Sequence, residues 1–236
     1  MWPGTQVLKN HAPEMGRGDQ RSTLETAAES PDHQQQTVQS ASSALSLRLR
    51  NETSSLHEQV ERDLRLPDSI HTLDEYRECL IRFYRLYRPL EAALLGCDGW
   101  SDAGLSIQER LRTVRLASDL CALGVVPIMM RDAPVRALPV MPSFAHSLGA
   151  LYVLEGATLG ARFILRRLEQ VLGAQLTGAT AFFACRIPNA EDSWKYFKKC
   201  LDDYGIAHPG EAQQVIEGAI ATFRSIGEWM KNDQHR

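Results

Sequence analysis

The sequence lacks the cysteine pattern of a disulfide-stabilised or zinc-binding protein. Its five cysteines are odd in number, scattered, and never arranged as a C-x-x-C pair. This usage indicates reduced thiols and predicts a cytoplasmic protein. The first residues show no charged region followed by a hydrophobic core, so no secretory signal is expected. No apolar run is judged long enough to cross a bilayer, and we expect no membrane partner.

An excess of positive charge is also missing. Lysine and arginine number 26 against 29 aspartates and glutamates, which gives a net charge of −3. Such a balance excludes a broad basic surface, and no nucleic-acid partner is predicted. The hydrophobic share of 44% and the charged share of 23% are typical of a soluble globular protein.

Alternation of polar and apolar residues, the mark of a half-buried strand, is absent over any five consecutive residues. There is no internal repeat and no long Gly/Ser linker. We therefore predict an all-α fold, with a single multihelical domain over residues 43–236. Residues 1–42 are rich in Gln, Ser, Glu, Asp and Pro, which predicts a disordered N-terminal extension.

The predicted helices are delimited by capping signals and prolines. A first helix is expected over residues 43–64, and Thr72–Glu75 forms a capping box that opens the next. Pro89 should kink this second helix or start a new segment. A second capping box, Ser106–Glu109, is expected to open a helix that turns Val114 inward. Further start signals are Ser143, Asn189 and Pro209.

One predicted helix, over residues 149–167, carries an unusual strip of glycines. Gly149, Gly156 and Gly160 are spaced by seven and four residues, so they lie on one helical face. Each glycine inside a helix costs about 1 kcal/mol relative to alanine. The strip exposes bare backbone, which serves either a tight crossing with another helix or close contact with a planar ligand.

The first helix carries a polar face beside its apolar stripe. Arg50, Thr53, His57 and Glu61 follow one another at steps of three and four residues. A carboxylate at i+4 can accept the Nδ1 proton of the His57 ring, which leaves Nε2 free to bind a metal. The alternative is a surface His–Glu pair worth a few tenths of a kcal/mol.

Common catalytic and metal-binding motifs are absent. No two histidines stand at i,i+4 and no Glu-x-x-His occurs, which argues against a zinc protease and a di-iron bundle. A G-x-S-x-G elbow, a P-loop and a G-x-G-x-x-G motif are missing as well. A single imidazole without other protein ligands suits heme, because the porphyrin supplies the other four donors.

Two segments resemble a known family. Residues 49–61 resemble the proximal helix of heme oxygenases, and residues 151–160 look like the distal helix of the bacterial, biliverdin-producing branch often found beside bacteriophytochromes. Support comes from Tyr87–Glu91, from Asp119–Gly124, and from Phe182-Phe183 followed by Trp194 and Phe197. The resemblance covers residues 44–230.

The resemblance implies a heme held between two helices. His57 matches the iron ligand, Glu61 the carboxylate that hydrogen-bonds it, and Arg50 a basic residue near the propionates. Gly156 and Gly160 match the distal glycines that leave room for oxygen. The remaining implied heme-binding residues are Thr53, Tyr152, Lys195 and Lys199.

Two positions depart from the wider family pattern. Ala157 stands where the animal-type enzymes carry an aspartate that orders water, although the bacteriophytochrome-linked branch generally lacks that aspartate. Ala161 stands where a glycine is common. The residue that supports the proton path is therefore not identified by the resemblance.

The implied activity is oxidative cleavage of heme to biliverdin, carbon monoxide and ferrous iron. The implied partners are heme, O2 and an electron donor such as a ferredoxin or a flavin reductase, with a bacteriophytochrome as a candidate recipient of biliverdin. Three alternatives stay open: a heme sensor or carrier that does not degrade heme, a thiaminase-like hydrolase of the same architecture, and a structural helical partner.

Overall fold

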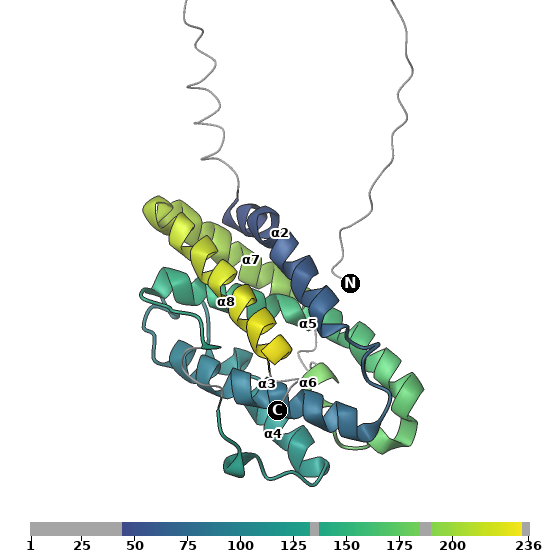
Figure 1. Ribbon diagram of the computed structural model, residues 1–236. Helices are drawn as coiled ribbons and strands as arrows, with labels where there is room; N and C mark the ends of the chain where they lie inside the picture. The colour runs from purple at the N-terminus through teal and green to yellow at the C-terminus, as the bar shows by residue number, and fades with distance from the viewer. Residues whose placement is uncertain (1–43, 133–136, 185–189, 233–236) are drawn as a thin grey trace, which may run out of the picture. The chain divides into compact units, whose positions relative to one another are not determined.

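The computed structural model describes residues 44–132, 137–184 and 190–232, and these ranges form seven α-helices and no strand (Figure 1). The all-α prediction is confirmed. The α-helices are α2 (Leu45–Leu64), α3 (Leu73–Leu95), α4 (Thr113–Ala122), α5 (Phe144–Leu172), α6 (Ala181–Ala184), α7 (Ala190–Ala207) and α8 (Ala212–Asn232). Short 3-10 turns are η2 (Gln108–Arg110), η3 (Pro127–Met129), η5 (Gly173–Leu176) and η6 (Pro209–Glu211). The predicted extension over residues 1–42 and the predicted cap at Asn189 lie outside the described residues.

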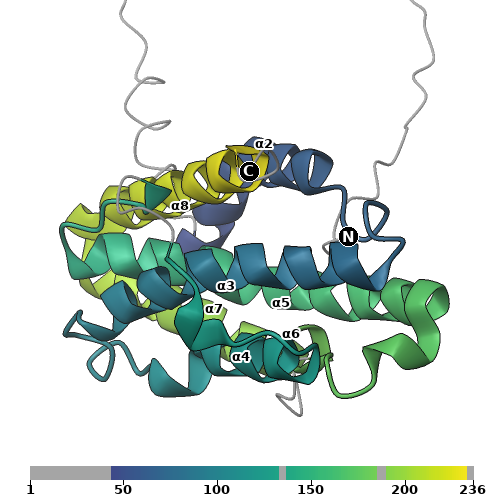
Figure 2. The ribbon, with the colours of Figure 1, turned by 60° about the horizontal axis from the view of Figure 1, so that its bottom comes forward.

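Helix α5 runs through the middle of the bundle, with α2 and α8 on one side and α4 and α6 on the other (Figure 2). It packs most extensively against α8, which also packs along α2. By length and composition, residues 144–176 of α5 and η5 are apolar enough to cross a membrane. This corrects the prediction that no apolar run reaches that length. However, 61% of its apolar window is buried inside the protein, as in the core helix of a soluble protein.

The start of α3 is confirmed in detail. The Thr72 hydroxyl accepts a hydrogen bond from the Glu75 amide at 3.2 Å, and the Glu75 carboxylate accepts one from the Thr72 amide at 2.9 Å. This pair satisfies two amides that a helix start otherwise leaves without partners. Pro89 lies inside α3 and no new segment begins there. Burial of Leu86, Leu90 and Leu94 around it supports the helix on both sides of the proline.

The second predicted capping box is wrong. Residues 108–110 form the turn η2, and the helix begins only at Thr113. Its true cap comes from a distant helix, because the Glu91 carboxylate of α3 accepts from the amides of Arg112 and Thr113 at 2.8 and 3.0 Å. Because the helix begins at Thr113, Val114 faces solvent rather than the core, and it is 76% exposed.

Other caps also depend on tertiary contacts. Asp119 of α4 accepts from the first amides of α6, those of Ala181 and Phe182, at 2.7 and 2.8 Å. Ser143 is the N-cap of α5, as predicted, but its hydroxyl bonds the side chains of His146 and Gln214. No disulfide joins the four described cysteines.

Candidate functional site

The polar face of α2 forms one wall of the site. The His57 Nε2 atom lies 3.7 Å from the Glu61 Oε1 atom one turn later. The predicted orientation, with Nδ1 facing Glu61, is therefore not the one in this structure, and binding a metal through Nε2 requires the ring to turn over. Thr53, one turn before His57, is buried, and its hydroxyl donates to the Leu49 carbonyl at 2.7 Å.

The His57 ring is enclosed but still reachable. Its side chain is 21% exposed, and its ring meets that of Phe223 from α8 edge-on at 5.9 Å. Burial lowers the pKa of His57 below its ordinary value of 6.5, while the Glu61 charge acts in the opposite direction. The imidazole is therefore neutral at neutral pH, which is the form that donates a lone pair to a metal.

The glycine strip of α5 divides into two parts. At Gly149 a side chain would overlap the Val215 carbonyl oxygen and contact the Ala219 amide of α8. At Gly160 a Cβ atom would meet nothing within 4 Å. Gly149 therefore serves the helix crossing, whereas the Gly160 end of the strip is open space beside bare backbone. Gly156 lies between them and is buried.

Tyr152 connects the two walls. It is buried on α5, and burial raises the pKa of its phenol. Hydrogen bonding with Thr53 and the positive charge of Arg50, both on α2, lower that pKa in turn. The structure thus brings Arg50 and Thr53 of α2 near Tyr152 of α5, three residues predicted from sequence. The Trp194 ring of α7 packs on Tyr152 at 5.5 Å.

The two predicted lysines lie on α7 and point to solvent. Lys195 pairs with Asp192 at 3.3 Å, and Lys199 pairs with Asp203 at 2.6 Å. Both are surface pairs within one helix, of the kind that contributes a few tenths of a kcal/mol. Either lysine can exchange this carboxylate for that of a ligand at little cost, and their assignment to a ligand stays a prediction.

Sequence reasoning missed a buried ion pair next to the strip. Glu155, immediately before Gly156, accepts from the Arg110 guanidinium of η2 at 2.7 Å. Their side chains are only 3% and 9% exposed. The signal was available, because Glu155 is the only charged residue between His146 and Arg162. Its partner lies 45 positions earlier, so the pairing itself could not be inferred.

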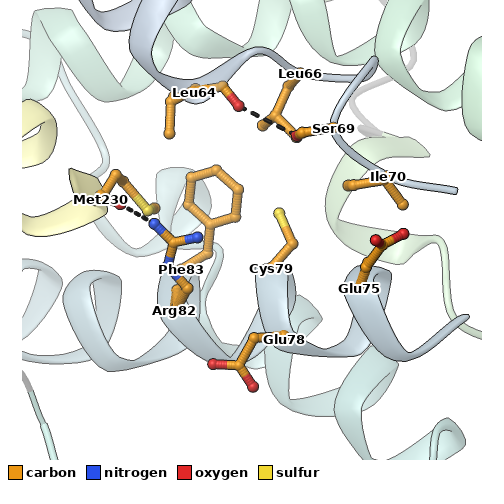
Figure 3. Close-up of a pocket in the computed structure, with 10 residues that line it drawn as sticks. All are labelled: Leu64, Leu66, Ser69, Ile70, Glu75, Glu78, Cys79, Arg82, Phe83 and Met230. Atoms are coloured by element: carbon orange, nitrogen blue, oxygen red, sulfur yellow. Dashed lines mark hydrogen bonds between the residues drawn. The ribbon is translucent and has the colours of Figure 1, made fainter. Parts of the chain in front are cut away.

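A cavity of about 180 Å³ lies among α2, α3 and α8, about two helical turns beyond His57 on α2 (Figure 3). Leu64 and Met230, which line it, come seven residues after His57 and Phe223 on the same two helices. Figure 3 shows the Cys79 sulfur of α3 pointing into it. Burial raises the pKa of this thiol to about 12, so it is neutral and a poor metal ligand.

Within the described ranges, no group of three or more His, Cys, Asp or Glu side chains could hold a metal ion. The site offers one neutral imidazole on α2, bare backbone at the Gly160 end of the α5 strip, and a basic and a phenolic side chain, Arg50 and Tyr152. These residues fit a flat macrocycle that brings its own metal donors, carries acidic groups and takes one axial ligand from the protein. These residues are therefore a candidate heme site on an all-helical protein.

Comparison with known proteins agrees with that fit. The family model described as heme oxygenase matches residues 43–232. The chain therefore belongs to the heme oxygenase family. The heme oxygenase of Neisseria meningitidis, solved with bound NO and CO, has a similar fold with a TM-score of 0.68 and 20% sequence identity. The match covers 80% of this chain and 92% of that one. No curated protein matches the sequence significantly.

Proposed function

We propose that this protein is a biliverdin-producing heme oxygenase, which cleaves heme with O2 and external electrons and releases carbon monoxide and ferrous iron. The observation that carries the proposal is the presence of a neutral, partly exposed His57 on α2 together with open space at Gly160 on α5. Bound heme would supply the oxygen and redox chemistry, and the protein would hold and orient it.

Each site residue has a proposed role. His57 would supply the nitrogen that holds the heme iron, and Glu61 would accept the other ring proton and fix the ring's orientation. Arg50 and Tyr152 meet the propionates at one end, with Thr53 supporting the Tyr152 phenol. Lys195 and Lys199 would hold the propionates from the far side.

The strip has a steric role in this proposal. Gly156 and Gly160 keep side chains away from the face opposite His57, so that oxygen has room beside the ring. Ala157 offers no acid to order water there. Proton delivery would therefore depend on ordered water and backbone groups rather than on an aspartate at that position.

The proposed partners follow from the reaction. Heme cleavage needs electrons from outside, so a ferredoxin or a flavin reductase is the expected donor, in the cytoplasm. The resemblance of residues 151–160 to the bacteriophytochrome-linked branch supports a bacteriophytochrome as the recipient of biliverdin. These assignments follow from the resemblance and the chemistry.

The test is a spectral assay of the full chain with hemin. We expect a stoichiometric complex with a Soret band. Addition of oxygen and ascorbate or a ferredoxin system, with catalase present, should replace that band by the broad red absorption of biliverdin. Catalase is needed because free peroxide destroys heme without guidance by the protein.

The possible results separate the candidate functions. A stable heme complex that yields no biliverdin with several reductants would support a sensor or carrier instead. Failure to bind hemin would remove the proposal and favour a thiaminase-like or structural role.

A further inference from the structure

The ion pair between Arg110 and Glu155 joins three elements around the strip. Glu155 comes from α5 and Arg110 from η2, with 2.7 Å between the guanidinium nitrogen and the carboxylate oxygen. The same guanidinium lies over the Phe197 ring of α7, 5.2 Å from its centroid. Arg110 therefore contacts α5 by a charge-assisted hydrogen bond and α7 by a cation–π contact.

The contacts return to α5 through aromatic rings. Phe197 stacks on Trp194 of the same helix at 5.8 Å, and Trp194 packs on Tyr152 at 5.5 Å. Tyr152 and Glu155 are three residues apart, one turn of α5. One connected set of side chains therefore contacts both ends of the α5 turn that precedes Gly156, at Tyr152 and at Glu155.

A pair buried this deeply is not explained by stability alone. Removing two charges from water costs several kcal/mol per ion, and an apolar pair of similar size is often as stable or more stable. What an apolar pair lacks is direction. The Arg110 guanidinium and the Glu155 carboxylate restrict the rotation and the axial position of α5 relative to η2, because the hydrogen bond between them weakens when either plane turns.

We propose that Arg110 and Glu155 are positioning residues that fix the α5 turn Tyr152–Gly156 over the bound heme. Neither touches the reacting atoms in this assignment. They act through the backbone of Gly156 and through the aromatic set that ends at Tyr152. The inference rests on the proposed function for its consequence in turnover, but its structural part concerns the protein alone.

The main test variant is R110M/E155L, which replaces the pair by apolar side chains of similar volume. The matched control is R48M/E52L, which makes the same changes at an exposed pair on α2 with a 3.2 Å contact. We expect both proteins to fold with melting temperatures close to that of the wild type.

Two readouts should move in R110M/E155L and stay unchanged in the control. Amide hydrogen exchange in residues 152–160 of the heme-free protein should be about tenfold faster, because this turn opens locally more often. Biliverdin formation should fall about 10²-fold, since a small misplacement at a reacting centre has effects of that size. R110K, which keeps the charge but loses the planar fork, should show intermediate values of both.

Unchanged exchange and unchanged turnover in R110M/E155L would overturn the inference and leave the pair a purely structural contact. If R110M/E155L fails to fold, R110K decides by the same two readouts. If the wild-type protein makes no biliverdin, the proposed function fails, while the exchange of residues 152–160 still shows whether the pair positions this turn.

Discussion

Gly149 of α5 and Gly218 of α8 lie on the two sides of a single helix crossing. A side chain on Gly149 would overlap the Val215 carbonyl, and one on Gly218 would overlap the His146 carbonyl. The two backbones therefore touch without side chains between them. This contact fixes α5 against α8, the helix whose Phe223 ring packs on His57. The tight crossing and the open strip are thus parts of one helix.

The first prediction compares Gly149→Ala with Gly160→Ala in the heme-free protein. The Gly149 variant should lose more than about 3 kcal/mol of unfolding free energy, because the clash is with backbone that cannot move aside. The Gly160 variant should gain up to about 1 kcal/mol from higher helix propensity in open space. Urea denaturation measures both. Similar effects at the two sites would contradict the division of the strip.

The second prediction concerns the open end of the strip. Gly160→Leu should fold normally, since a Cβ there meets nothing within 4 Å. With hemin present, however, the side chain would occupy the space above the ring, so biliverdin formation should fall about 10²-fold. Glu169→Leu, on the exposed surface of the same helix, is the control. Full turnover in Gly160→Leu would show that this space is not used.

Sequence periodicity was a sound guide to the helices because their apolar faces follow the 3.6-residue repeat. It failed where a residue distant in the sequence determines where a helix begins. The start of α4 is set by Glu91 of α3, so a local capping signal at Ser106 misled. The spacing of the glycines likewise could not show that Gly149 and Gly160 have different roles. Gly149 differs only because the backbone of α8 lies against it.

The candidate site was predictable to the same extent. The α2 face and Tyr152 could be proposed from the sequence because their spacing and resemblance are local properties of the chain. The contribution of Phe223, from the last helix, could not be inferred because it depends on how α8 packs along α2. The same holds for the Arg110 partner of Glu155, which reaches α5 from a 3-10 turn.

The third prediction is that His57→Ala keeps the fold and loses the axial ligand. The ring lies at the edge of the core and is partly exposed, so its loss should cost little stability. The spectrum of the hemin complex should change from a histidine-ligated form, turnover should collapse, and added imidazole should restore part of it. His71→Ala, at an exposed position, is the control. A wild-type spectrum in His57→Ala would disprove the ligand assignment.

The last prediction concerns pH and follows from the depressed pKa of His57. Burial lowers that pKa below 6.5, and Glu61 only partly opposes the effect. The unfolded chain therefore binds a proton at this ring more readily than the folded protein. Above pH 6.5 the ring is neutral in both states, and the folded protein keeps its full stability from this group. As the pH falls from 6.5 through the folded pKa, that stability is lost.

Glu61→Gln should lower the pKa of His57 further, as followed by NMR titration of the ring in the heme-free protein. His57→Gln should reduce the loss of unfolding free energy between neutral and mildly acidic pH. A His57 pKa above 6.5 in the wild type, or a rise in that pKa on Glu61→Gln, would show that burial does not control this imidazole.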